Sequence, residues 1–217
     1  MNEQSPPNRC RLVLIAPPGA EPERFEADLG AALAAGDVAS LILPQYAMDE
    51  DRFQAFAERA VPIAQERGVA VLIAGDSRIA GRVHADGLHI EAGKQELADA
   101  IVRLQGRMMV GAGGAKTRDD ALELGELRPD YLFFGRFGYD KDAEPHPRNL
   151  TLGRWWAEMI EIPCVVLGGT EVASVEAVAA TGAEFVALSA AVFDRDAGKA
   201  VAEANAILDR TAPRFEE

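Results

Sequence analysis

The sequence predicts an α/β protein built as a single-domain (β/α)8 barrel. The first observation is length, because 217 residues, 48% of them hydrophobic and 26% charged, suffice for one domain with a large buried core. The second is that eight short apolar runs recur along the chain, and the third is that stretches with helical spacing separate them. Eight strands alternating with helices over roughly 200 residues match the architecture of a TIM barrel.

Each apolar run is short, continuous and often β-branched, which is typical of a strand buried on both faces of a parallel sheet. RLVLIA and VASLIL, the first two, show this pattern most clearly. The expected strands are 11–16, 38–43, 69–74, 87–90, 107–112, 130–135, 163–168 and 184–189.

Helices are expected between consecutive strands because apolar residues recur there every three or four positions. In the first of these stretches, Phe25, Leu29 and Leu33 share one helical face. The expected helices are 21–35, 49–67, 76–84, 95–104, 117–125, 151–160, 171–181 and 194–210.

The chain reads as one domain preceded by a short arm. Residues 1–10 are polar and contain two prolines, so we expect a flexible N-terminal arm followed by a barrel domain at 11–217. A doubly wound open sheet is the alternative architecture. It is the weaker one, because the first strand-to-helix turn, APPGAEPE, lacks the G-x-G-x-x-G of dinucleotide-binding folds.

Charge and cysteine content exclude several classes of function. Lys and Arg number 22 against 35 Asp and Glu, and the net charge of −13 repels nucleic acids and anionic membranes. The apolar runs are far shorter than the roughly 20 residues of a membrane span. Cys10 and Cys164 lie beside apolar runs and are expected to be reduced core residues. We therefore expect a cytoplasmic protein without a nucleic-acid or membrane partner.

A phosphate-binding site is predicted after the last two strands. Active sites of such barrels lie on the loops that follow the strands, and phosphate often binds after strands seven and eight through exposed backbone N–H groups. Gly168 and Gly169 follow the seventh strand, and Ser189 and Ala190 follow the eighth. In the alternative interpretation, the glycines only close tight turns.

The loop after the sixth strand, over 136–149, gathers basic residues in an acidic protein. Arg136, Lys141, His146 and Arg148 all lie on it. It is expected to be either a lid over an anionic ligand or an irregular solvated loop. Arg136 is the best single candidate, because it stands where a strand ends at the mouth.

Other titratable residues give weaker signals. Asp76 follows the third strand, and His89 lies near the end of the fourth, where it could be a general base or a half-buried residue bonded to the backbone. Glu91 and Glu96 could also reach the mouth. A single carboxylate is a poor magnesium site, so no protein-bound metal is predicted from the residues alone.

Six stretches, in order and spacing, resemble the thiamine-phosphate synthase family, which includes the thiazole tautomerases. They are ERGVAVLIAGD, HADGLHI, MVGAGGAKTRDDAL, PDYLFFGRF, IPCVVLGGT and GAEFVALSAAVF. The resemblance implies a (β/α)8 barrel that joins hydroxymethylpyrimidine diphosphate to thiazole phosphate. Diphosphate leaves with the help of Mg²⁺, and the thiazole phosphate is held by the residues that match the family's phosphate site, Gly168, Gly169, Ser189 and Ala190.

The chain departs from the family pattern on the diphosphate side. In the family, a Gln-x-Arg-x-Lys belongs to strand two, an Asn-Asp follows strand three, a metal carboxylate follows strand four and a serine follows strand five. Other residue types occupy these positions here. The same is true of the family's Thr-x-Thr-Lys and of the tautomerases' histidine, both after strand six. These positions here are Ile42, Pro44, Tyr46, Ala74, Gly75, Lys94, Gly113, Asp140 to Ala143 and Arg136. The resemblance therefore implies Mg²⁺ without matching its ligands, and leaves Arg136 or Lys141 to stabilise the departing diphosphate, with Asp76 as a third catalytic candidate.

Three functions are compatible with these residues. The first is a transferase of thiamine biosynthesis that forms the carbon–nitrogen bond of thiamine phosphate. The second is a non-catalytic, regulatory barrel that binds a small phosphorylated ligand. The third is an isomerase or lyase acting on a phosphorylated metabolite, with Asp76 or His89 as its acid–base group. Assembly into a homo-oligomer stays open.

Overall fold

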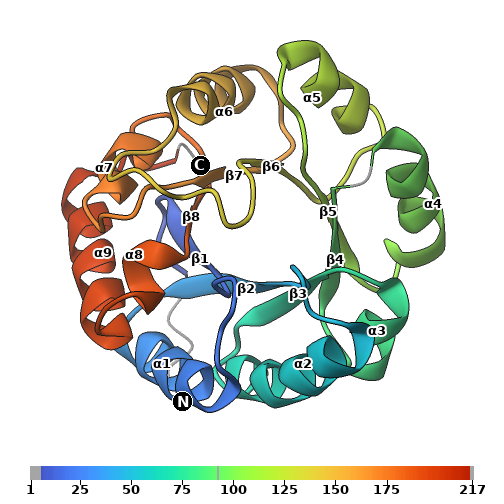
Figure 1. The fold of residues 1–217 in the computed structure, drawn as a ribbon. Helices are drawn as coiled ribbons and strands as arrows, with labels where there is room; N and C mark the ends of the chain where they lie inside the picture. The colour runs from blue at the N-terminus through green and yellow to red at the C-terminus, as the bar shows by residue number, and fades with distance from the viewer. Residues whose placement is uncertain (1–5, 92, 216–217) are drawn as a thin grey trace.

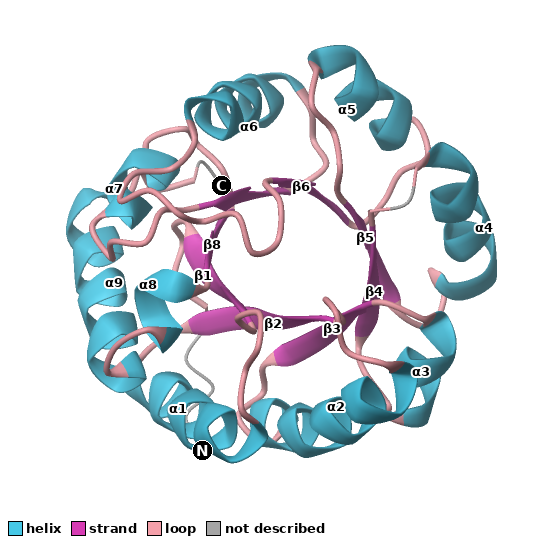
Figure 2. Ribbon diagram, viewed as in Figure 1, coloured by secondary structure: helices cyan, strands magenta, loops and turns pink. Residues whose placement is uncertain are grey.

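The computed structural model describes residues 6–91 and 93–215. Across them, eight parallel strands pair in chain order, and β8 pairs with β1 to close the barrel (Figure 1). Helices surround this ring on the outside (Figure 2). The predicted (β/α)8 barrel is confirmed. The strands are β1 (Arg11–Ile15), β2 (Val38–Pro44), β3 (Ala70–Ala74), β4 (Gly87–Ile90), β5 (Met109–Ala112), β6 (Tyr131–Phe134), β7 (Cys164–Leu167) and β8 (Phe185–Leu188).

The helices follow the strands with three differences from the expected ranges. The helix expected at 171–181 is confined to Ser174–Ala179, the helix expected from 151 begins at Pro147, and the segment expected as 194–210 starts later, after a separate short helix. The helices are α1 (Pro22–Ala35), α2 (Glu50–Gln65), α3 (Ser77–Arg82), α4 (Lys94–Leu104), α5 (Arg118–Gly125), α6 (Pro147–Met159), α7 (Ser174–Ala179), α8 (Ala190–Phe193) and α9 (Ala197–Thr211).

Local capping explains where several helices begin. Thr117 and Asp120 form a reciprocal capping box at the start of α5. The carboxylate of Asp196 accepts the N–H of Lys199, so α9 begins after residue 196 rather than at Asp194. His146 caps α6 through its Nδ1, and Pro147 takes the first helical position, where its missing N–H costs nothing.

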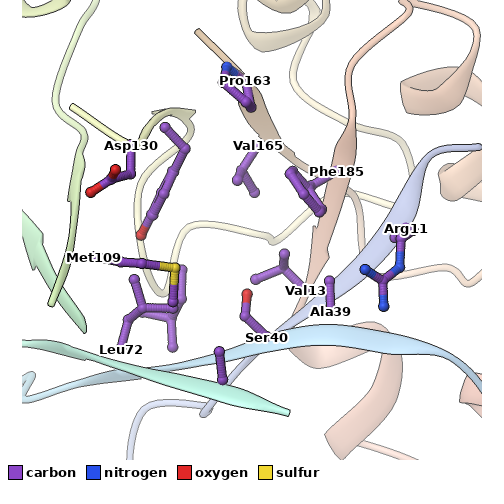
Figure 3. Close-up of a pocket in the computed structure, with 13 residues that line it drawn as sticks. Arg11, Val13, Ala39, Ser40, Leu72, Met109, Asp130, Pro163, Val165 and Phe185 are labelled. Carbon is purple, nitrogen blue, oxygen red and sulfur yellow. The ribbon is translucent and has the colours of Figure 1, made fainter. Parts of the chain in front are cut away.

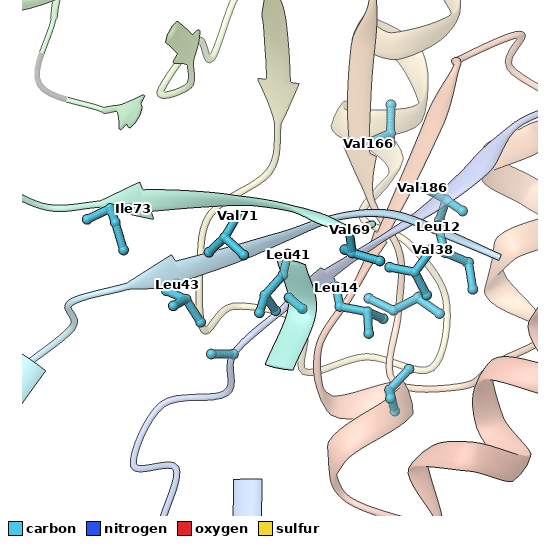
Figure 4. Packing of buried hydrophobic residues seen from close by; sticks show 14 of the residues in the cluster. Leu12, Leu14, Val38, Leu41, Leu43, Val69, Val71, Ile73, Val166 and Val186 are labelled. Atoms are coloured by element: carbon cyan, nitrogen blue, oxygen red, sulfur yellow. The ribbon is translucent and has the colours of Figure 1, made fainter. Parts of the chain in front are cut away.

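The core has two layers because neighbouring residues of each strand point to opposite sides of the sheet. On β1, Val13 and Ile15 belong to the cluster that fills the barrel, whereas Leu12 and Leu14 belong to the larger cluster beneath the helices. Figure 4 shows part of this outer layer. Tyr131 and Phe133 belong to the inner layer. Pairing of Leu12 with Val186 and of Leu14 with Leu188 sets the register that closes the ring.

The segment before β1 is anchored to the last helix. Residues 1–5 of the expected arm lie outside the described residues, but Arg9 and Cys10 are buried. The Arg9 guanidinium donates to Asp209 at 2.8 Å, to Asn205 at 2.9 Å and to the carbonyl of Cys10 at 2.8 Å. The barrel therefore begins at least two residues before β1. Within the part of the chain described, no helix has the length and apolarity to cross a membrane.

Candidate functional site

A cavity of about 740 Å³ opens at the mouth of the barrel, where the strands end at their carboxyl sides. The loops after β2, β3, β4 and β6 line it. Its polar and aromatic lining residues are Gln45, Tyr46, His89, Glu91, Glu96, Arg136, Phe137 and Tyr139. This is the end where barrel chemistry is placed.

A second cavity of about 250 Å³ lies at the opposite end of the barrel (Figure 3). Its walls are mainly apolar, and the charged groups there are paired. Asp130 accepts the N–H of Val110 at 2.6 Å, and Arg11 forms a bidentate ion pair with Asp37. At the mouth, Glu91, Glu96 and Arg136 form no ion pair among the described residues, so the mouth is the better candidate site.

Two predicted catalytic cations come together at the mouth. The Arg136 guanidinium lies 3.8 Å from the ring centroid of Tyr139, and the Lys141 ammonium lies 5.2 Å from the same ring. Tyr139 thus orients both cations through cation–π contacts. Burial raises the pKa of Glu91, and the positive charge of Arg136 acts in the opposite direction. Arg136 and Glu91 are therefore close enough to influence each other.

The structure does not bring Asp76 to this cavity. Asp76 caps the start of α3, where its carboxylate accepts the backbone N–H of Arg78 at 2.7 Å and also bonds the Arg78 guanidinium. These bonds hold the pKa of Asp76 below its ordinary value. It lines a smaller hollow of about 300 Å³. Capping and ion pairing account for this residue without a catalytic role.

The predicted phosphate-binding residues lie together on the adjacent strands β7 and β8, which pair at Leu167 and Ala187. The Ser189 side chain is buried, and within the described residues its Oγ has no hydrogen-bond partner. The N–H of Gly169 donates to Ser174 Oγ at 3.0 Å. Binding of phosphate by this hydroxyl and these amides stays a prediction.

The loop after β6 fills this predicted phosphate cradle. Asp140 accepts the N–H of Ala190 at 2.8 Å, and the carbonyls of Asp142 and Ala143 accept the N–H groups of Thr170 and Glu171 at 2.8 and 3.3 Å. The helix expected from residue 171 begins only at Ser174, and these N–H groups bond the loop instead. The β6 loop thus packs against the residues that follow β7 and β8, and its role as a lid stays a prediction.

Sequence reasoning missed the partners of His89. This side chain is buried, and its Nδ1 lies 2.7 Å from the hydroxyl of Tyr131. Phe133 and Phe137 pack against its ring at centroid distances of 5.6 and 5.0 Å. Tyr131 begins β6 within an ordinary apolar run, so the sequence carries no signal that its hydroxyl meets a histidine two strands away.

The residues present do not fit a dedicated magnesium site. No group of three or more potential ligands occurs among the described residues. Asp76 is bonded to Arg78, and Glu91 faces the charge of Arg136. Mg²⁺ is commonly bound by one or two carboxylates together with substrate phosphates rather than by an all-protein cage.

Comparison with known proteins decides the family. The model of the family described as thiamine monophosphate synthase matches residues 12–192. The chain belongs to this family. A thiamine-phosphate synthase from Rhodospirillum centenum is 34% identical over 200 residues, which cover 90% of this chain and 95% of the relative. One from Hyphomonas neptunium is 32% identical and covers 91% and 92%.

A solved thiamine phosphate pyrophosphorylase from Pyrococcus furiosus superposes with a TM-score of 0.79. It is 21% identical, and the match covers 95% of this chain and 98% of that one. At that identity the likeness concerns the fold. Together, these comparisons confirm the resemblance that the six sequence stretches indicate, and they place the chain among the proteins of thiamine biosynthesis.

Proposed function

We propose that this chain is a thiamine-phosphate synthase-type transferase acting in the cytoplasm. It takes thiazole phosphate at the ends of β7 and β8 and a pyrimidine diphosphate in the mouth cavity. The observation that carries the proposal is the buried Ser189 hydroxyl, for which no partner exists among the described residues, beside the backbone of Gly169 and Ala190. A buried hydroxyl without a partner costs about 1–3 kcal/mol, which a phosphate oxygen would recover.

The proposed reaction breaks the bond between the pyrimidine methylene carbon and the diphosphate oxygen. The electron pair of that bond leaves with diphosphate, and the thiazole nitrogen supplies the pair for the new carbon–nitrogen bond. Arg136, which lines the cavity, and Lys141, which contacts the same Tyr139 ring, are the cations proposed to stabilise the departing charge. The same loop must withdraw Asp140 from Ala190 before a phosphate can take that N–H.

A non-catalytic barrel that binds a phosphorylated ligand is the second candidate. The observation that favours it is that Asp76 is bonded to Arg78 and that the described residues hold no group of three or more potential metal ligands. In that case the β7–β8 site would bind thiazole phosphate, and the loop after β6 would change its conformation when the ligand binds. The two candidates share the phosphate site and differ in turnover.

The deciding experiment mixes the protein with hydroxymethylpyrimidine diphosphate and thiazole phosphate, with and without Mg²⁺, and follows thiamine phosphate by mass spectrometry. Turnover is expected, and Arg136→Ala should lower kcat/KM by about 100-fold, as loss of one oxyanion-stabilising group does. Arg148→Ala is the matched control, because Arg148 is an exposed arginine just past the same loop. Folded protein that binds thiazole phosphate by calorimetry and forms no product would establish the second candidate.

A further inference from the structure

We propose that Tyr139 is a positioning residue of the mouth cavity, whose ring holds Arg136 and Lys141 together so that both charges bind one anionic ligand. The inference rests on the proposed function, because it adds the residue that organises the two cations assigned there to the departing charge. Tyr139 acts through these cations and not on the reacting atoms. Its basis is a tight turn, two cation–π contacts and an exposed aromatic ring without a packing role.

A tight turn brings the ring of Tyr139 back to Arg136. The N–H of Tyr139 donates to the carbonyl of Arg136 at 3.2 Å, and Gly138 between them has a φ of +73°. Glycine adopts this left-handed conformation without the strain that a Cβ would add. The turn begins just after β6, and its loop projects over the ring of strands (Figure 1).

Neighbouring loops hold the turn in place on both sides of the ring. A Cβ added at Gly138 would lie 3.5 Å from Tyr46 Cε1 and 3.7 Å from Pro18 Cγ, so the backbone there lies close to the loops after β2 and β1. On the other side, the carboxylate of Asp140 accepts the N–H of Ala190 at 2.8 Å. A ring between two such anchors has a defined place at the mouth.

The ring gathers two cations that would otherwise repel each other. The Arg136 guanidinium lies 3.8 Å and the Lys141 ammonium 5.2 Å from the ring centroid, both within the roughly 6 Å over which a ring face attracts a cation. Neither cation forms an ion pair with the described residues, although the chain has a net charge of −13. Both charges therefore remain available to an anion.

Packing does not explain a large aromatic side chain at this position. Tyr139 is 53% exposed and belongs to neither of the two hydrophobic clusters formed by the described residues. Phe137 of the same loop packs against the inner cluster, so the loop already has a hydrophobic anchor. Arg136 and Tyr139 line the mouth cavity, and the ring connects Lys141 to it. The Tyr139 ring therefore contacts the cations rather than the core.

Holding the two cations in place before the ligand arrives should increase the affinity for a polyanion. Arginine and lysine side chains lose rotamer freedom when they bind a ligand, and that loss weakens binding unless it has already occurred. Without the ring, the charges of Arg136 and Lys141 would separate because like charges repel. Loss of the ring should therefore weaken anion binding in the mouth cavity and leave the phosphate cradle after β7 and β8 unaffected.

The test measures the binding of inorganic diphosphate to the full chain by calorimetry, without Mg²⁺ and without a second substrate. Tyr139→Leu removes the ring face and should weaken this binding about 5-fold, the effect of losing two exposed cation–π contacts. Tyr139→Phe keeps the ring and should restore most of the lost affinity. Wild-type affinity in Tyr139→Leu, an equal loss in Tyr139→Phe, or no binding of diphosphate to the wild type would each overturn the proposal.

Two further measurements separate positioning from a general effect on the loop. In a Lys141→Ala background, the loss caused by Tyr139→Leu should shrink to about 2- to 3-fold, because one of the two contacts is already gone. An undiminished loss would show that the ring does not act through Lys141. The Kd for thiazole phosphate should be the same in wild type and Tyr139→Leu, and a weaker one would assign the effect to the loop as a whole.

The proposed function and this inference can fail separately. Diphosphate binding that depends on the Tyr139 ring, in a protein that forms no thiamine phosphate, would support the positioning role and contradict the transferase. Turnover by the wild type, together with unchanged diphosphate binding in Tyr139→Leu, would support the transferase and overturn the positioning role.

Discussion

The carboxylate of Asp140 accepts the backbone N–H of Ala190 at 2.8 Å, so an anion of the chain itself stands in the proposed phosphate cradle. Burial raises the pKa of Asp140 above its ordinary value, and the Ala190 N–H opposes that rise. The ionised carboxylate is therefore held at a net cost relative to water. A phosphate that reaches the cradle displaces a poorly solvated competitor.

Removing this competitor should strengthen phosphate binding. In Asp140→Asn the charge-assisted bond to Ala190 becomes an ordinary one, a loss of about 1 kcal/mol for the closed loop. We expect the Kd for thiazole phosphate, measured by calorimetry, to fall about 5-fold. Asp142→Asn is the matched control, because it removes the same charge from an exposed side chain of the same loop. An equal effect in both variants would assign the change to net charge rather than to the Ala190 contact.

Gly169 is required by the contact between the β6 loop and β7. A Cβ at this position would collide with the carbonyl of Ala143, and overpacking of this kind costs about 1–3 kcal/mol. Gly169→Ala should therefore release the loop and speed tryptic cleavage after Lys141 by at least about 5-fold. Gly30→Ala, whose Cβ meets nothing within 4 Å in α1, should leave cleavage unchanged. Unaltered cleavage in Gly169→Ala would mean that the loop does not depend on this contact.

Burial of neutral His89 predicts acid sensitivity. In the unfolded chain the imidazole takes a proton near pH 6.5, whereas in the folded protein burial lowers its pKa to about 3. Between these values the unfolded state binds more protons, so stability falls as the pH is lowered through this window, by at most about 1.4 kcal/mol per unit. The free energy of unfolding of wild type, measured in urea, minus that of His89→Phe should fall as the pH is lowered through this window. A difference that does not change with pH would contradict this.

Arg9 should matter far more to stability than an exposed arginine does. Its buried guanidinium satisfies the acceptors of Asn205 and Cys10, which Arg9→Ala leaves unpaired. We expect a loss of about 2–3 kcal/mol in urea unfolding. Arg24→Ala, which removes an exposed helical pair with Asp28, should cost less than about 0.5 kcal/mol. Similar losses in both would show that the anchoring of residue 9 is dispensable.

The fold was predictable because its signals are local. Apolar runs of four to six residues predicted every strand in order, and Thr117 marked a helix start that the capping box confirms. The shortened α7 was not predictable, since the N–H groups of Thr170 and Glu171 bond carbonyls of a loop far away in the sequence. Hydrogen bonds of that kind produce no periodic pattern in the sequence.

The candidate site was predictable in position and only partly in content. The barrel rule located the mouth cavity, which Arg136 lines, and the residues after β7 and β8 stay a predicted phosphate site. Asp76 stays a predicted catalytic residue, and its capping bond to Arg78 depends on a turn that residue type alone does not specify. His89 was expected to bond backbone if it was not a base. Its pairing with Tyr131 follows from the register of β4, β5 and β6, which the apolar runs alone do not specify.

Closure of the ring has a consequence for synthesis on the ribosome. Leu12 of β1 pairs with Val186 of β8, so the first strand cannot complete its pairing until the last strand has been synthesised. At roughly 5–20 residues per second, that interval lasts many seconds, during which one edge of β1 has no strand beside it. Unpaired edges invite pairing between nascent chains. Chains that stop before β8 should therefore be recovered as aggregates or degradation products rather than as smaller folded barrels.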